Sequence, residues 1–506
     1  MPVVIDGGPL TFDDVIAVSR GTEVRVDAGV AERMAPAQML VERATAENQV
    51  VYGVTTGFGA LASTRIDPNQ AAELQIALLR SHAAGVGRPL PSEMVRAIVL
   101  LRARTLSQGY SGVRPIIVER LVQLLNADLL PVIPAQGSVG ASGDLAAFAH
   151  MALPLIGEGE VTLDGEPVPA AAALAAAGIE PITLQPKEGL SLLNGTEGML
   201  AFGVIGLHRA HRLLQAADLA CAMSVDALRG SSRPFRPEVH QLRPHPGQVT
   251  SAANIARLLE GSEIGASHHD DFVHAVQDAY SLRCAPQVHG ACRDAVAYAA
   301  ATFETELGSV VDNPIVFPET GEVLSAGNFH GQPLALALDT MAMAMTELAS
   351  IAERRIDRML DPNHSDGLPA FLSPAPGINS GLMLAQYTAA ALVAENRVLS
   401  HPASVESIPT SGSQEDHVSM GWGAGRKLFD VLLNTRRVLA VELMCAAQAL
   451  DYRRPLAPAP LVAAACDALR QVSPSIDVDR AIAGDIEAIS DLVADGSLVA
   501  AAEGLD

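Results

Sequence analysis

The sequence predicts a mainly α-helical protein, an extended bundle of long helices with a smaller loop-rich N-terminal region. The chain has 506 residues, of which 49% are hydrophobic and 18% charged, so it can bury a large core. Aromatic residues make up only 4%, while Ala and Leu are plentiful, a composition that favours closely packed helices. Apolar residues also recur at helical spacing over long stretches.

Residues 1–110 mix short helical patterns with Gly-rich connections, whereas the helical period dominates residues 111–506. We therefore expect an N-terminal helical region followed by a long-helix bundle. The clearest evidence is an apolar stripe at four-three spacing, formed by Leu334, Leu338, Met341, Met345, Leu348 and Ala352. A second long helix is expected from about Arg426 to Leu450, with inward positions at Leu428, Leu432, Leu439 and Ala446.

Further helices are expected near residues 190–228, 288–308 and 380–399. A small hairpin is expected over residues 160–168, because Asp164-Gly165 is a favoured two-residue turn, and a similar turn is expected around residues 319–322. Ala-rich helix faces allow several such bundles to associate, so we expect a homo-oligomer.

Composition also excludes several classes of partner. The net charge of −23 argues against a nucleic-acid or anionic-membrane surface, because both need basic patches. The five cysteines form no C-x-x-C pair, which argues against a zinc site or disulfide framework and is typical of reduced, cytoplasmic thiols. The N-terminus has no signal-peptide pattern, and the apolar runs are interrupted and too short to span a bilayer.

The most informative segment is residues 137–145, a small-residue turn that precedes an apolar helical run. No base stands near Ser142 in the sequence to activate it as a nucleophile. In Ala141-Ser142-Gly143, however, the Gly143 nitrogen can approach and attack the Ala141 carbonyl carbon, because glycine has no Cβ. Ring closure and loss of water would turn Ser142 into an exocyclic methylidene, which is a carbon electrophile.

The tripeptide alone is weak evidence, since Ala and Gly are abundant. A plain alternative is that Ser142 or Asp144 is only the N-cap of the following helix. In that case the protein could be a helical scaffold in which the tripeptide never cyclises, and its intact mass would show no loss of water.

Polar side chains elsewhere stand out from apolar surroundings. Tyr52 lies in a Gly-punctuated loop at residues 51–59, and His82 lies near the end of a helical run. Gln277, Tyr280 and Arg283 are spaced i, i+3, i+6, which predicts one side of a helix, and Arg283 could grip a carboxylate bidentately. The remaining candidates are Asn194, Phe329, Gln414 and Glu415. Residues 414–417 are all polar, but adjacent side chains point to different sides of the chain, so no metal site is expected there.

Taken together, these motifs resemble the aromatic amino-acid ammonia-lyase family, in the expected order from about Tyr52 to Met420. Gly140-Ala141-Ser142-Gly143-Asp144-Leu145 matches the segment from which that family builds a methylidene-imidazolone group. Asp312-Asn313-Pro314 is a further landmark of the family. The resemblance assigns active-site positions to Tyr52, Asn194, Gln277, Tyr280, Arg283 and Phe329.

Two segments resemble the members of the family that act on histidine. These are Ser81-His82 and Gln414-Glu415-Asp416-His417. An imidazole is polar at both nitrogens and suits His82 and Glu415, whereas an apolar phenyl ring would leave a buried Glu415 without a polar partner. Ser411-Gly412-Ser413 departs from the family by having small residues where bulkier ones are expected.

The resemblance implies elimination of ammonia from L-histidine to give trans-urocanate, a step of histidine degradation. It implies a methylidene-imidazolone group, no added nucleotide or metal, and a cytoplasmic homotetramer with sites built from more than one subunit. Arg283 is expected to bind the substrate carboxylate with Asn194 or Tyr280. Tyr52 is the first candidate for the base that removes the β-proton, and Glu415 is the competitor.

Two other enzyme readings remain. Within the family, the substrate could be tyrosine or phenylalanine, with lyase or aminomutase chemistry. The fumarase and aspartase group also forms helical tetramers, but its Gly-Ser-Ser loop with Met, Pro and Lys is absent from this sequence.

Overall fold

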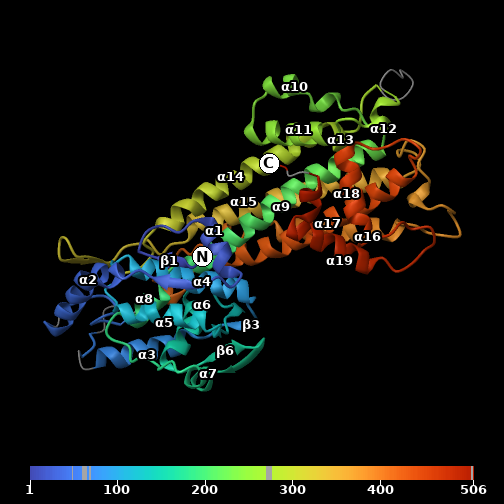
Figure 1. Cartoon of the computed structure of the whole chain (residues 1–506). Helices are drawn as coiled ribbons and strands as arrows, with labels where there is room; N and C mark the ends of the chain where they lie inside the picture. The colour runs from blue at the N-terminus through green and yellow to red at the C-terminus, as the bar shows by residue number, and fades with distance from the viewer. Residues whose placement is uncertain are drawn as a thin grey trace. The chain divides into compact units, whose positions relative to one another are not determined.

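The computed structural model describes most of the chain, and its described residues are 1–47, 49–57, 59, 65–67, 70–268, 276–502 and 505. Within them the protein is mainly helical, which confirms the predicted fold class (Figure 1). The chain forms two compact units. Unit 1 comprises residues 1–205, 300–339 and 402–426, and unit 2 comprises residues 206–299, 340–401 and 427–506.

Unit 1 holds many short helices and, among the described residues, all the strands. Its complete helices are α1 (Phe12–Ser19), α2 (Gly29–Ala46), α3 (Ala71–His82), α4 (Ser92–Ser107), α5 (Pro115–Asn126), α6 (Leu145–Ala152), η3 (Leu153–Ile156), α7 (Ala170–Ala176), α8 (Glu188–Leu193), η6 (Ala403–Val405) and η7 (Ser411–Ser413). Several begin at residues suited to helix starts. The Thr11 hydroxyl accepts from Asp14 N and the Asp14 carboxylate bonds back to Thr11 N, which is a capping box, and α5 starts at a proline.

Over the described parts of the chain the strands are short and make four small sheets. The strands are β1 (Val3–Ile5), β2 (Val24–Val26), β3 (Val86–Pro89), β4 (Leu130–Pro131), β5 (Pro134–Gln136), β6 (Glu160–Leu163), β7 (Glu166–Pro169), β8 (Ile315–Phe317) and β9 (Glu322–Leu324). The sheets are parallel β1–β2 and antiparallel β3–β5, β4–β6–β7 and β8–β9. The predicted 160–168 hairpin is confirmed, with Asp164 and Gly165 both at positive φ in its turn. The turn near residues 319–322 joins β8 to β9.

Long helices occur from residue 197 onward. They are α9 (Glu197–Ala227), α14 (Ala285–Gly308), α15 (Gln332–Leu360), α16 (Met383–Leu399) and α17 (Gly421–Asp451). The shorter helices of unit 2 are η4 (Arg233–Phe235), α10 (Pro237–Gln241), α11 (Pro246–Leu258), α12 (Glu263–Ala266), α13 (Tyr280–Arg283), η5 (Ala370–Leu372), α18 (Pro460–Arg470), α19 (Ala483–Asp495) and α20 (Ser497–Ala501).

The two predicted apolar stripes are confirmed. All six stripe residues of α15 are fully buried, and the four predicted inward residues of α17 are at most 2% exposed. By length and composition α15 could cross a membrane, contrary to the expectation that no apolar run is long enough. However, 72% of its most apolar window is buried inside the protein, as in the core helix of a soluble enzyme.

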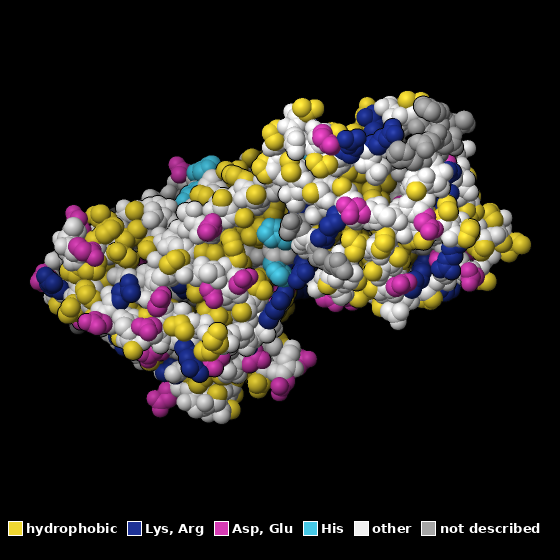
Figure 2. Space-filling view, turned by 45° about the horizontal axis from the view of Figure 1, so that its top comes forward, with side chains coloured by type: hydrophobic (Ala, Val, Ile, Leu, Met, Phe, Trp, Pro, Cys, Tyr) yellow, Lys and Arg dark blue, Asp and Glu magenta, His cyan; other side chains and the backbone are white. Residues whose placement is uncertain are grey.

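Surface charge is dispersed. On the face shown in Figure 2, Asp and Glu side chains are scattered among neutral and hydrophobic ones, and Lys and Arg occur in small separate groups. This distribution agrees with the net charge of −23 and offers no extended basic field on that face.

Candidate active site

Ala141-Ser142-Gly143 forms a tight turn in unit 1. Gly140, Ser142 and Gly143 have φ values of 75°, 49° and 79°, a left-handed conformation that side chains disfavour. A Cβ on Gly143 would lie 1.9 Å from the Gly195 carbonyl oxygen, and one on Gly140 would lie 2.1 Å from Ser419 Oγ. At Gly143 the obstacle is backbone, so only glycine fits there, whereas at Gly140 a larger residue would displace the Ser419 hydroxyl and strain the left-handed turn.

Three helices begin next to this turn. The first is α6, which starts at Leu145 directly after it. The second is α9, whose Met199 N–H donates to Asp144 Oδ2 at 2.9 Å. The third is α17, whose preceding residue Met420 donates its N–H to the Val139 carbonyl at 2.9 Å. Helix N-termini carry partial positive charge, so these starts favour negative charge developing near Ser142.

Asp144 does not act as the simple cap of its own helix. It occupies the N-cap position of α6, but its side chain makes no capping hydrogen bond there. It accepts instead from the first turn of α9 and, at 3.3 Å, from Ser138 Oγ. Complete burial raises the pKa of the Asp144 carboxyl to about 8, and nearby Glu197 adds to the effect.

A cavity of about 430 Å³ opens onto Ser142. Its polar lining includes Tyr52, His82, Asn194 and Glu415, which the structure therefore brings together with Ser142 from segments far apart in the sequence. The apolar lining comes mainly from α3, α6 and α8, namely Ile66, Leu74, Ala77, Leu78, Leu145, Leu190 and Leu193. A neighbouring cavity of about 260 Å³ shares His82 and Glu415 and is also lined by Ala141 and Gly143. All of these residues belong to unit 1.

Tyr52 is held by its own loop. Its hydroxyl oxygen accepts the Gly59 N–H at 3.0 Å. Gly53 beside it donates its N–H to Thr56 Oγ1 at 3.1 Å and accepts from Gln75 Nε2 at 3.3 Å. Because Gln75 lies in α3, the loop is attached to the helix that ends at His82.

His82 is the last residue of α3 and lies half-buried at the cavity. Its Nδ1 is 3.0 Å from the Leu78 carbonyl oxygen and 3.1 Å from Ser81 Oγ. A carbonyl only accepts, so Nδ1 carries a proton in that contact, and in the neutral ring Nε2 is an acceptor. Burial lowers the pKa of His82, which favours the neutral ring, although the Leu78 carbonyl and Glu415 act in the opposite direction.

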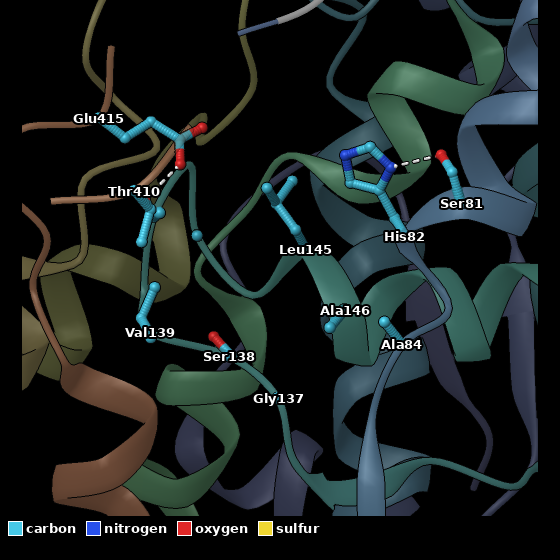
Figure 3. Close-up of a pocket in the computed structure, with 12 residues that line it drawn as sticks. Ser81, His82, Ala84, Gly137, Ser138, Val139, Leu145, Ala146, Thr410 and Glu415 are labelled. Atoms are coloured by element: carbon cyan, nitrogen blue, oxygen red, sulfur yellow. Dashed lines mark hydrogen bonds between the residues drawn. The ribbon is translucent and has the colours of Figure 1, made fainter. Parts of the chain in front are cut away.

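Glu415 approaches from a different segment, in a loop between η7 and α17. Its Oε2 accepts from Thr410 Oγ1 at 2.8 Å, and Thr410 N–H donates to the Glu415 carbonyl at 2.9 Å. Figure 3 shows the His82 ring and the Glu415 carboxylate on either side of Leu145, with the second ring nitrogen of His82 turned away from Ser81. Thr410 was not anticipated, because nothing in the sequence around Pro409 distinguishes it from an ordinary turn residue.

The other anticipated residues are placed differently. Gln414 is exposed, Phe329 is half-buried, and neither lines the two cavities described above. Gln277, Tyr280 and Arg283 belong to unit 2. The prediction that they share one helix side is wrong, because α13 covers only Tyr280–Arg283 and Gln277 precedes it in a bend. The Arg283 guanidinium stacks on the Tyr280 ring at 4.6 Å, and its Nε donates to the Asp278 carbonyl.

Fold and site define a class of protein. The family model for aromatic amino acid lyases matches residues 10–471, nearly the whole chain, and the chain belongs to that family. Its helices and the glycine-framed Ser142 turn are those of a carbon–nitrogen lyase.

Individual members of the family are similar to this chain over nearly its whole length. The chain is 52% identical over 502 residues to histidine ammonia-lyase of Gloeobacter violaceus, covering 99% of this chain and 97% of that protein. Tyrosine aminomutase of Streptomyces globisporus has a similar structure, with TM-score 0.94, 42% identity and coverage of 100% and 99% of the two chains. Histidine ammonia-lyase of Trypanosoma cruzi matches with TM-score 0.91, 40% identity and coverage of 99% and 95%.

Proposed function

We propose that this protein eliminates ammonia from L-histidine to give trans-urocanate. The observation that carries the proposal is the pairing of His82 and Glu415 on the wall of the cavity that contains Ser142. The Nε2 acceptor of neutral His82 suits an imidazole N–H, and the Glu415 carboxylate suits the other edge of a protonated ring. An apolar ring would leave both polar groups facing hydrocarbon. The 52% identity to a histidine ammonia-lyase supports the same substrate.

The methylidene-imidazolone group of this family fits Ala141-Ser142-Gly143. The left-handed turn and the absence of a Cβ at Gly143 let the backbone fold onto itself, and the bridge between Gly143 and Gly195 holds the turn in place. Once formed, the group supplies a carbon electrophile to the amino-acid substrate. The N-termini of α6, α9 and α17 favour the negative charge that the reaction develops there.

The chain's own residues then bind the substrate and move its proton. Arg283 is proposed to bind the substrate carboxylate with the help of Asn194 or Tyr280, in a site built from more than one subunit. Tyr52 is proposed as the base that takes the β-proton, and such help contributes roughly 10²–10⁴-fold to the rate. Glu415 is proposed to hold the imidazole. Its distance from any proton of the substrate decides between this role and that of the base.

The substrate is tested by ultraviolet detection of product. Histidine should give urocanate, whereas the alternative substrates tyrosine and phenylalanine would give coumarate and cinnamate or β-amino acids. The similarity to a tyrosine aminomutase is the reason for testing tyrosine as the alternative substrate. Turnover of tyrosine but not histidine would replace the proposed substrate.

Ser142→Ala tests the electrophile. The variant should lose turnover and keep the mass of the uncyclised chain, while the wild type should be lighter by two water molecules. Thermal unfolding provides the control for folding. Substantial turnover by Ser142→Ala, or an unmodified wild-type mass in an active preparation, would refute the electrophile.

The variants Tyr52→Phe and Glu415→Gln test which residue removes the β-proton and which one holds the imidazole of the substrate. Tyr52→Phe should lower kcat strongly with a small change in KM, whereas Glu415→Gln should mainly raise KM for histidine. Thr410→Val is the matched control, because it removes only the hydroxyl that orients Glu415 and should shift KM in the same direction by less. The reverse pattern would make Glu415 the base.

We also propose a cytoplasmic homotetramer. Sedimentation at several protein concentrations should give the mass of four chains, and dissociation by dilution should lower activity in parallel. An active monomer would contradict this assembly.

A further inference from the structure

A fully buried polar cluster includes a residue of α8, the helix whose Leu190 and Leu193 line the cavity, and has no role in the chemistry described above. Lys187 Nζ donates to Asp312 Oδ2 at 2.9 Å and to Ser191 Oγ at 2.8 Å. The Ser191 hydroxyl donates in turn to Asp312 Oδ2 at 2.9 Å. All three side chains have 0% exposure. A buried ion pair adds little net stability, because the cost of desolvating the charges offsets their attraction. We therefore looked for a functional role of this cluster.

The second carboxylate oxygen of Asp312 fixes the backbone that follows it. The Asn313 N–H donates to Asp312 Oδ1 at 2.7 Å. The Asn313 side-chain oxygen accepts from Ala326 N–H at 2.8 Å and from Ser325 Oγ at 3.2 Å. The Asn313 residue is therefore held on both its backbone and its side chain, and its carbonyl has a set direction.

That carbonyl accepts from the cavity residue Asn194, whose Nδ2 lies 2.9 Å away. A carbonyl cannot donate, so it selects the amide nitrogen of Asn194 and excludes its oxygen. One N–H of Asn194 is thereby engaged, and Oδ1 and the other N–H are left for the cavity. The direction of the Asn313 carbonyl thus decides which atoms Asn194 presents to a ligand.

The same carboxylate also holds α8, the helix that ends directly before Asn194. The Ser191 hydroxyl of α8 donates to Asp312 Oδ2, and Asn194 is the first residue after this helix. Asn194 is followed by Gly195, whose carbonyl accepts the Asp144 N–H at 2.8 Å. Asp312 therefore ties α8 and the 312–313 segment into one frame, and that frame continues to the Ser142 turn. Burial acts to raise the pKa of Asp312, but Lys187 and Arg102 outweigh it and hold the pKa below its ordinary value, so the carboxylate is charged.

We propose that Asp312 is a positioning residue that orients the Asn194 amide for the substrate carboxylate, a role that rests on the proposed function. The carboxylate of Asp312 acts through Ser191 on one side and through Asn313 on the other. Lys187 neutralises it without entering the cavity. Asn194 is the group that touches the ligand.

The test is a double-mutant cycle with Asp312→Asn and Asn194→Ala. The readouts are kcat/KM for histidine and the Kd of trans-urocanate by calorimetry, which needs no turnover. Asp312→Asn alone should lower kcat/KM and raise the Kd of trans-urocanate, each about fivefold or more, because residues within one hydrogen-bond network couple. In the Asn194→Ala background it should change them less than about twofold. Equal effects in both backgrounds would show a merely structural role and overturn the proposal.

Glu442→Gln is the matched control. Glu442 is also fully buried, and it also accepts from a cation, Arg355, and from a serine hydroxyl, Ser224. Its substitution removes a comparable charge, so its effect should be the same with and without Asn194→Ala. Coupling of Glu442 to Asn194 as strong as that of Asp312 would overturn the proposal.

If Asp312→Asn fails to fold, Ser191→Ala replaces it in the cycle. That variant keeps the Lys187–Asp312 ion pair and should couple to Asn194 in the same direction by less. Additive behaviour of Ser191→Ala would then contradict the proposal. If the wild type binds coumarate or cinnamate but not urocanate, the proposed substrate fails, and the same cycle run with the bound acid still decides the role of Asp312.

Discussion

Gly143→Ala gives the sharpest test of the Ser142 turn. The new Cβ would lie 1.9 Å from the Gly195 carbonyl oxygen, whereas ordinary contacts are 3.4–4 Å. The two segments must therefore separate by more than an ångström, which breaks the 2.8 Å bond from Asp144 N–H to the same carbonyl. A left-handed alanine costs about 1–2 kcal/mol, and the lost buried hydrogen bond costs about 1–3 kcal/mol more. The variant should lose about 2–5 kcal/mol of stability in total.

Gly165→Ala is the matched control. Gly165 also has a positive φ, 87°, but nothing lies within 4 Å of the position of its Cβ. It should lose only the conformational part, about 1–2 kcal/mol. The difference between the two variants therefore measures the collision with Gly195.

Thermal unfolding and intact mass are the assays. Gly143→Ala should unfold at a lower temperature than Gly165→Ala and should retain the mass of the uncyclised chain, because the displaced backbone no longer brings the residue 143 nitrogen to the Ala141 carbonyl. Equal unfolding temperatures, together with a mass lower by two waters in Gly143→Ala, would refute the reasoning from geometry.

Two further predictions concern buried charge. The pKa of Asp144 is about 8 in the folded protein and 3.8 as its reference value, so its contribution to stability is present below about pH 4 and is lost as the pH rises through 8. Asp144→Asn should flatten that part of the curve of unfolding temperature against pH, and an unchanged curve would show that Asp144 is ionised when folded. Arg355→Met should cost about 3–5 kcal/mol, because it strands the buried Glu442 carboxylate, whereas Arg355→Met with Glu442→Met should recover most of that loss. Equal chemical-denaturation midpoints for the single and double variants would contradict this.

Periodicity in the sequence predicted the long helices because burial along a helix depends on local spacing. The six stripe residues of α15 and the Asp164-Gly165 turn needed no distant partner to be recognised. The expected helix over residues 190–228 is instead divided into α8 and α9, with Asn194 between them. Asn194 bonds to Asn313 and Gly195 to Asp144, and hydrophobic spacing carries no trace of such long-range bonds.

The sequence also identified the residues that carry the chemistry, and the family resemblance grouped them, but neither showed which partners hold each side chain in place. Ala141-Ser142-Gly143 predicts a cyclisation from three adjacent residues, because the reaction joins atoms of neighbouring peptide units. The bond from Thr410 to Glu415 depends on the local fold of their loop, and the bond from Asn194 to the Asn313 carbonyl joins segments that are 119 residues apart in the sequence.

The sequence by itself determined the helical class, the positions of its long buried stripes and the presence of the small-residue turn, since each depends on local spacing or on adjacent atoms. The family resemblance predicted that Tyr52, His82, Asn194, Ser142 and Glu415 serve one site. The tertiary structure decided how they line its cavity and that Gly143 tolerates no side chain. Those facts arise from packing between distant segments, where a single carbonyl oxygen, such as that of Gly195, fixes what its neighbour can be.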